Sequence, residues 1–165
     1  MGGLGGPSNI TRLEGYLTGI KGVEWIYNVQ KADTSGTSRN YMQNLTAQTT
    51  TSTTPVSIGS TNVIAQISGR VKIDVVVRGN NNTLSDGITV SLYAGASSGA
   101  LTTLIDSETY TQEGAASNSH TFVIHYEQTG IAVGGVSEYY SIAINSITGG
   151  TASAKIIAFI LEEVM

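Results

Sequence analysis

Cysteine, basic charge and long apolar runs are all scarce in this chain, and each shortage excludes a class of protein. With no cysteine, the chain forms neither disulfide bonds nor thiolate metal sites, so the fold must rest on packing. Only 12% of the 165 residues are charged and the formal net charge is −4, which offers no basic surface to nucleic acid. No uninterrupted apolar stretch approaches the ~18 residues that span a bilayer, so we expect no membrane partner.

The side chains that carry out catalysis do not form a recognisable site in the sequence. No motif of the common metal-binding, phosphate-binding or hydrolase sites occurs. His120 and His125 are an odd number of residues apart on one predicted strand, so they point to opposite faces and cannot bind one ion. Asp86, with Asn80 and Asn82, lacks the spacing of a hand-type calcium loop, and turn formation explains the same residues. We predict that the protein is not an enzyme and has no catalytic, cofactor or metal site.

Alternating apolar and polar residues are frequent from Val56 to the C-terminus. A period of two predicts strands with one buried face, because successive side chains of a strand point to opposite faces. The predicted strands lie at residues 62–68, 71–78, 88–92, 101–109, 121–127, 138–145 and 152–161. Turns rich in Gly, Asn and Asp separate them, and no convincing helix occurs. The sequence therefore predicts an all-β fold, an antiparallel jelly-roll sandwich formed by residues 56–165.

The last predicted strand, residues 152–161, has an apolar residue at almost every position. On an unbroken strand, one face carries Ala154, Ile156, Ala158 and Ile160, and the other carries Ile157, Phe159 and Leu161. A single-domain sandwich needs only one of these faces for its core. We therefore predict that the second face forms a subunit contact, with Ile157, Phe159 and Leu161 at the interface of a homotrimer.

Residues 1–55 have a different character and are predicted to form an extended Gly-rich N-terminal arm followed by a linker or peripheral strand. Half of residues 1–8 are glycine, and the segment has neither the basic residues nor the apolar run of a secretory signal, so we expect synthesis in the cytoplasm of the producing cell. The polar residues 31–40 are typical of a loop. Residues 46–54 are rich in threonine and precede Pro55, which is compatible with a solvated linker, a peripheral strand or a clasp along a neighbour.

Large apolar and aromatic residues are scattered through residues 9–29 between glycines, without a regular pattern. Trp25 has two interpretations, a core residue of the domain or an anchor onto another subunit, since Trp and Tyr are frequent at interface hot spots. We predict that this segment binds a partner through Leu13, Tyr16, Leu17, Trp25 and Tyr27.

From about residue 54 onward, the order of these segments resembles the tumour-necrosis-factor-like jelly-roll modules of tailed-phage virion proteins. The resemblance rests on RVKI at 70–73, ITVSLY at 88–93, SHTF at 119–122, EYYSIAI at 138–144 and IIAFILEE at 156–163. Residues before 54 carry none of it. The resemblance implies a jelly roll, and it implies a homotrimer in which apolar residues of terminal strands meet on the threefold axis.

The resemblance and the composition favour a viral structural protein that decorates a capsid, often called a cement protein. In that role the partners are two further copies of the chain and the major capsid protein, and the location is the capsid exterior of a bacteriophage virion. Two alternatives remain. One is the receptor- or carbohydrate-binding head of a phage tail fibre, and the other is a single-jelly-roll capsid protein.

Overall fold

The computed structural model describes residues 39–65, 68–113, 118–134 and 137–164. These residues form strands joined by loops and contain no helix, and thus none long and apolar enough to cross a membrane. The strands are β1 (Arg39–Thr50), β2 (Val56–Ile64), β3 (Val71–Asn81), β4 (Gly87–Gly95), β5 (Thr103–Thr111), β6 (His120–Gln128), β7 (Ser137–Ser146) and β8 (Ala152–Glu163).

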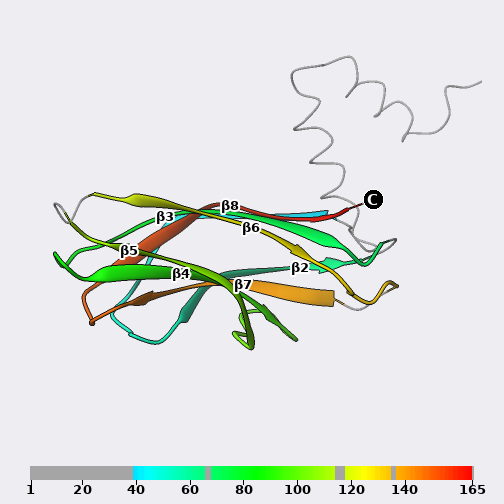
Figure 1. Cartoon of the computed structure of the whole chain (residues 1–165), viewed down its shortest axis with the longest axis horizontal. Coiled ribbons are helices and arrows are strands. Elements are labelled where there is room, and N and C mark those ends of the chain that lie inside the picture. The colour runs from blue at the N-terminus through cyan, green and yellow to red at the C-terminus, as the bar shows by residue number, and fades with distance from the viewer. Residues whose placement is uncertain (1–38, 66–67, 114–117, 135–136, 165) are drawn as a thin grey trace, which may run out of the picture. The chain divides into compact units, whose positions relative to one another are not determined.

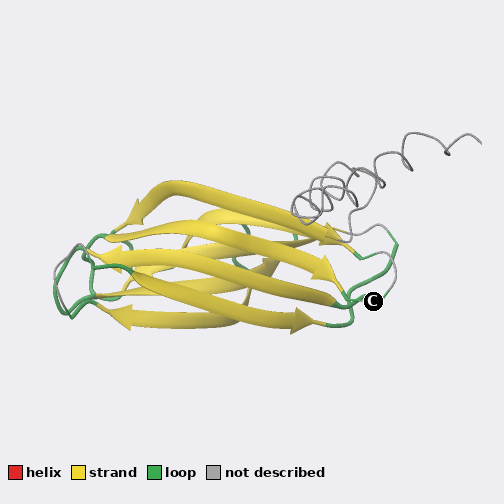
Figure 2. Cartoon of the chain, turned by 90° about the horizontal axis from the view of Figure 1, so that it is seen from above, coloured by secondary structure: helices red, strands yellow, loops and turns green. Residues whose placement is uncertain are grey.

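The strands form two antiparallel four-stranded sheets, ordered β1-β8-β3-β6 and β2-β7-β4-β5, which stack as two layers (Figure 1). Successive strands cross from one sheet to the other, except that β4 and β5 are neighbours within one sheet. Figure 2 shows the strands running lengthwise with their loops gathered at the two ends of the sandwich. This is a double-sheet jelly roll, which confirms the predicted fold class. The predicted N-terminal arm lies outside the described residues.

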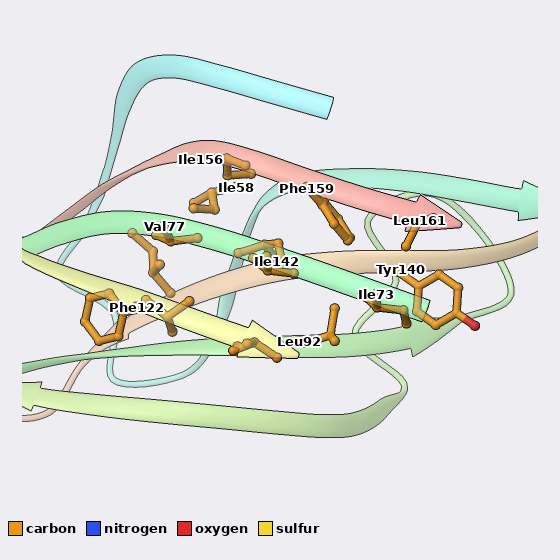
Figure 3. Close-up of a cluster of buried hydrophobic side chains, with 14 of the residues drawn as sticks. Ile58, Ile73, Val77, Leu92, Phe122, Tyr140, Ile142, Ile156, Phe159 and Leu161 are labelled. Carbon is orange, nitrogen blue, oxygen red and sulfur yellow. The ribbon is translucent and has the colours of Figure 1, made fainter. Parts of the chain in front are cut away.

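The core lies between the two sheets, where the inward faces of both meet (Figure 3). The inward faces predicted for residues 71–78 and 88–92 are confirmed, because the predicted inward side chains are all buried: Val71, Ile73, Val75, Val77, Ile88, Val90 and Leu92. The largest buried apolar side chains are Ile73, Ile88, Leu92, Phe122, Tyr140, Ile142, Ile144, Ile156, Phe159 and Leu161. Both layers contribute, so the core joins segments that are distant in the sequence.

Strand β1 pairs with β8 at the edge of its sheet. Residues 39 and 40 therefore belong to a strand, and the prediction of a loop across residues 31–40 is wrong at its end. The threonine-rich segment after it is the peripheral strand that the sequence allowed, up to Thr50. Its polar side chains gave little signal of a strand, because an edge strand is held mainly by backbone hydrogen bonds to its neighbour. Met42 is a side chain of β1 that packs against the core.

Strand β8 contains a β-bulge at Ile157, so the prediction of an unbroken alternation is wrong. In the pairing with β3, Val76 lies opposite Ala158 and Val77 lies opposite Ile156, which leaves Ile157 as the extra residue. A one-residue shift moves the following side chains to the opposite face. Ala152, Ala154 and Ile156 face the core before the bulge, and Phe159 and Leu161 face it afterwards. Figure 3 shows Phe159 and Leu161 among the core side chains.

Candidate interaction face on strand β8

The outer side of sheet β1-β8-β3-β6 carries a row of apolar side chains across three neighbouring strands. Val123 of β6 lies opposite Val76 of β3, and Val76 lies opposite Ala158 of β8. Ile157 stands beside this row at the bulge, and Ile160 follows on the same side of β8. Val123 is 46% exposed and the other four are half-buried. We call these five residues the β8 face.

Charged side chains lie on both sides of the β8 face and leave its centre uncharged. On one side, His125 Nδ1 lies 2.6 Å from Asp74 Oδ1, and Lys72 Nζ lies 3.1 Å from Asp74 Oδ2. On the other side, Arg78 lies opposite Lys155 in the pairing of β3 with β8. An apolar centre with a charged rim is the usual layout of a protein–protein contact surface.

Asp74 carries the negative charge nearest to the β8 face, since it lies opposite Ile160 in the sheet. Partial burial raises the pKa of Asp74, but the hydrogen bonds and charges of His125 and Lys72 lower it by more, so the net pKa lies below its ordinary value. The carboxylate is therefore ionised at neutral pH and fixes the orientation of the two basic side chains beside it.

The predicted trimer-interface residues are divided by the bulge. Ile157 lies half-buried on the outer side of the sheet, away from the core. Phe159 and Leu161 are both 0% exposed and belong to the core of the chain's own sandwich, so they are not available for a contact between subunits. Ala158 and Ile160 instead lie on the outer side together with Ile157. The sequence had placed these two residues on the opposite face of the strand from Ile157. No sequence signal marked the bulge, because Ile is equally suited to either face.

The five residues predicted to contact a capsid lie outside the described residues. They are Leu13, Tyr16, Leu17, Trp25 and Tyr27. Their role therefore stays a prediction.

Asp86 is held by two loops at one end of the sandwich. Its Oδ1 accepts hydrogen bonds from the backbone amides of Gly87 at 2.7 Å and Thr148 at 2.8 Å. Its Oδ2 accepts from the Ser146 hydroxyl at 2.7 Å and the Gly150 amide at 2.6 Å. Burial raises the pKa of Asp86, but these four hydrogen bonds outweigh it and hold the pKa well below its usual range.

These contacts give Asp86 a structural role, as the turn interpretation of the sequence predicted. Its buried carboxylate joins the loop after β3 to the loop after β7. The residues that the structure describes contain no group of three or more His, Asp or Glu side chains placed to hold a metal ion.

The two histidines point to opposite faces of β6, as predicted. His125 lies on the outer side beside Asp74, whereas His120 stacks on Tyr110 with ring centroids 4.6 Å apart and contacts the edge of Phe122. His120 Nε2 also lies 3.2 Å from Glu108 Oε1, which joins β6 to β5 across the open edge of the sandwich.

A second surface feature lies on the outer side of sheet β2-β7-β4-β5. Tyr93 and Tyr139 are half-buried on neighbouring strands and lie diagonally, since Tyr93 pairs with Ser141 and Tyr139 with Gly95. A hollow of about 380 Å³ lies at the end of these two strands; its lining includes Glu138 and part of the loop between β4 and β5 but neither tyrosine. Two tyrosines beside polar groups form a surface with both apolar and hydrogen-bonding character.

No family model matches the chain, and no curated protein matches it. Among solved structures, a chain of infectious bursal disease virus, Gt strain, has 12% identity and a TM-score of 0.48, with 76% of this chain and 33% of the viral chain covered. This chain thus spans about a third of that viral chain. A protein of Bacillus endospore appendages has 11% identity and a TM-score of 0.34, with 77% of this chain and 91% of the appendage protein covered. A carbohydrate-binding module solved with β-1,4-galactotriose has 11% identity and a TM-score of 0.32, with 76% of this chain and 88% of the module covered. Likeness at this identity concerns the β-sandwich fold and nothing beyond it.

Proposed function

We propose that this chain is a viral structural protein, a capsid decoration protein that assembles as a homotrimer through the β8 face and stabilises the capsid shell. The proposal is supported by the jelly-roll topology together with the sequence resemblance to virion jelly-roll modules. The observation that carries it is the apolar row of Ala158, Val76 and Val123, which crosses three strands on the outer side of the sheet.

A second copy of the chain is the occupant that best fits the chemistry of the β8 face. Residues close to a rotation axis face their own copies, so a charge there would meet a like charge. The centre of the β8 face is apolar, and Lys155 and Asp74 lie to either side of it. Burial of this apolar row between subunits gains roughly 25 cal/mol for each Å² removed from water.

The trimer is tested by Ile157→Asp, which places a charge in the proposed interface. Burying an unpaired charge costs several kcal/mol, so the variant is expected to sediment as a monomer while the unaltered protein sediments as a trimer. The matched control is Leu104→Asp, which introduces the same charge at a residue that is 54% exposed on the other sheet. A trimer is expected for the control. A monomeric unaltered protein would overturn the proposed assembly.

The role on the capsid is tested by adding the purified protein to capsids that lack their decoration protein. The unaltered protein is expected to bind and to raise the temperature at which the capsids come apart. Ile157→Asp is expected to bind much more weakly, because a monomer loses the gain from three linked contacts. Equal binding by the monomeric variant would show that assembly through the β8 face is not needed for attachment.

A second candidate function is carbohydrate binding, as in the head of a tail fibre, and the half-buried pair Tyr93 and Tyr139 on the outer side of the sheet favours it. Sugar rings pack on aromatic faces while their hydroxyls bind polar groups nearby. Calorimetry with a panel of neutral oligosaccharides tests this function. Binding that is lost in Tyr139→Ala, and kept in Ile157→Asp, would favour the receptor-binding role over decoration.

A further inference from the structure

Two basic side chains lie next to each other on the outer side of sheet β1-β8-β3-β6. Arg78 of β3 is the direct partner of Lys155 of β8 in an antiparallel pair, and both residues are exposed. Directly opposed side chains of such a pair have Cβ atoms roughly 5 Å apart, and like charges at this position destabilise the sheet. A negative charge beside the pair would offset this repulsion.

The described residues do not place a negative charge next to this pair. Among the residues that the structure describes, no carboxylate lies within ion-pair distance of Arg78 or Lys155. Two other basic side chains do have carboxylate partners, since Arg70 Nη2 lies 2.6 Å from Glu127 Oε1 and Lys72 Nζ lies 3.1 Å from Asp74 Oδ2. Arg78 and Lys155 thus place two positive charges together in a chain whose net charge is −4.

Arg78 and Lys155 line a hollow of about 290 Å³, and none of the described residues that line it is acidic. One wall includes Ala47, where β1 leaves its register with β8 between Asn44 and Gln48. Ser119 and Ser153 add hydroxyl groups to the lining. The irregular edge strand thus forms a recess beside the two cations.

The guanidinium of Arg78 is already oriented within this recess. Its Nε donates a hydrogen bond to the Ser119 hydroxyl at 2.6 Å. The two terminal nitrogens of an arginine offer a planar fork that matches an oxyanion, and a lysine adds a compact positive charge. An orientation fixed before binding reduces the entropy lost when a ligand is bound.

We propose that this recess binds a tetrahedral oxyanion, phosphate or sulfate, between Arg78 and Lys155. The Arg78 fork takes two oxygens, Lys155 neutralises the remaining charge, and the Ser119 and Ser153 hydroxyls complete the shell. The site borders the apolar β8 face but shares no residue with it, and it does not depend on the proposed decoration role. The same chemistry fits a free anion or an ester group on a larger ligand.

The test is a titration of the full chain with inorganic phosphate, at constant ionic strength maintained with potassium chloride. Saturable shifts of the Ser119 and Lys155 backbone amide signals are expected in NMR spectra. Arg78→Gln and Lys155→Gln are each expected to weaken binding at least tenfold. The matched control is Lys72→Gln, which removes a cation already paired with Asp74 and is expected to bind phosphate like the unaltered protein.

Titrations with sulfate and with acetate define the class of anion. Sulfate is expected to compete with phosphate, and acetate is expected to compete poorly, because a planar carboxylate meets only one face of the site. Shifts that grow linearly without saturation, or that are equal in Arg78→Gln and the unaltered protein, would show general screening of charge and would overturn the proposal.

Discussion

At the scale of single residues, Asp86 shows how one buried charge organises a loop end. A carboxylate has two oxygens with about four acceptor positions, and Asp86 uses four donors from Ser146, Gly87, Thr148 and Gly150. Gly150 has no side chain at the closest approach, where a Cβ atom would stand 2.5 Å from Asp86 Oδ2. The Asp86 carboxylate can therefore accept the Gly150 amide hydrogen bond only while position 150 has no side chain.

The first prediction concerns Asp86→Asn. The amide keeps one acceptor oxygen but turns an NH₂ group toward backbone donors, so we expect a loss of at least about 2 kcal/mol in the free energy of unfolding at neutral pH. Urea titration measures this loss. Asp106→Asn is the control, because Asp106 is exposed, and it is expected to be nearly neutral.

The same residue predicts a dependence of stability on pH. The folded-state pKa of Asp86 lies below its ordinary value of 3.8, so its charge contributes stability that is present above about pH 4 and is lost as the pH falls further. The unfolding free energy of the unaltered protein should therefore fall more steeply in acid than that of Asp86→Asn. Parallel slopes for the two proteins would contradict a depressed pKa.

At the scale of elements, the sequence predicts strands well where one face is buried and poorly where backbone pairing alone holds the strand. The alternation in β3 and in the first half of β6 follows from burial against the opposite sheet, so it is visible in the residues themselves. β1 buries little, and its pairing with β8 is made by backbone groups that every sequence has. The bulge at Ile157 depends on the register of both neighbours, which no single segment encodes.

The candidate sites follow the same rule. The β8 face needs the bulge to bring Ile157, Ala158 and Ile160 to one side, so the sequence found the strand but assigned two wrong residues to its outer side. Arg78 and Lys155 are far apart in the chain and become neighbours only through the pairing of β3 with β8. Pairing between distant strands thus creates the recess, and composition gives no sign of it.

The bulge itself predicts the effect of a one-residue deletion. Removing Ile157 restores plain alternation, since Ile156 would face inward, Ala158 outward and Phe159 inward again. We expect the deletion to preserve a cooperative fold, with the loss of the Gln43 side-chain hydrogen bond to the Ile157 carbonyl, and to weaken the trimer. Removing Ile160 instead should turn Leu161 out of the core and lower the free energy of unfolding by several kcal/mol.

Urea unfolding followed by circular dichroism compares the stability of the two deletion variants. Equal damage from both deletions would show that the bulge is needed for folding.

At the scale of the whole molecule, the sandwich and the N-terminal residues are expected to have different tasks. The core of the described residues is built from β-strands beginning at Arg39. The residues predicted to contact a capsid all precede that point. Attachment and assembly are therefore expected to be separable by truncation.

Deletion of residues 1–22 is expected to leave a folded trimer that no longer binds capsids lacking their decoration protein. The reason is that the deleted segment includes Leu13, Tyr16 and Leu17, whose burial against a partner offsets the cost of ordering a glycine-rich chain. Sedimentation checks the trimer and co-sedimentation with capsids checks binding. Undiminished binding would place the contact on the jelly roll itself and would favour the tail-fibre role.

The loops at the two ends of the sandwich are expected to differ in how well they tolerate inserted residues. Asp86 in the loop after β3 accepts hydrogen bonds from the loop after β7. Residues inserted in either loop would separate this buried carboxylate from its donors. The loop between β4 and β5 is different, because Ala96, Ser97 and Ser98 are exposed and the turn closes locally through the Ala100 amide and the Ser97 carbonyl. A foreign epitope inserted before Ser97 should therefore be tolerated. This loop would make the protein a carrier for displayed peptides, with one copy of the insert on every subunit.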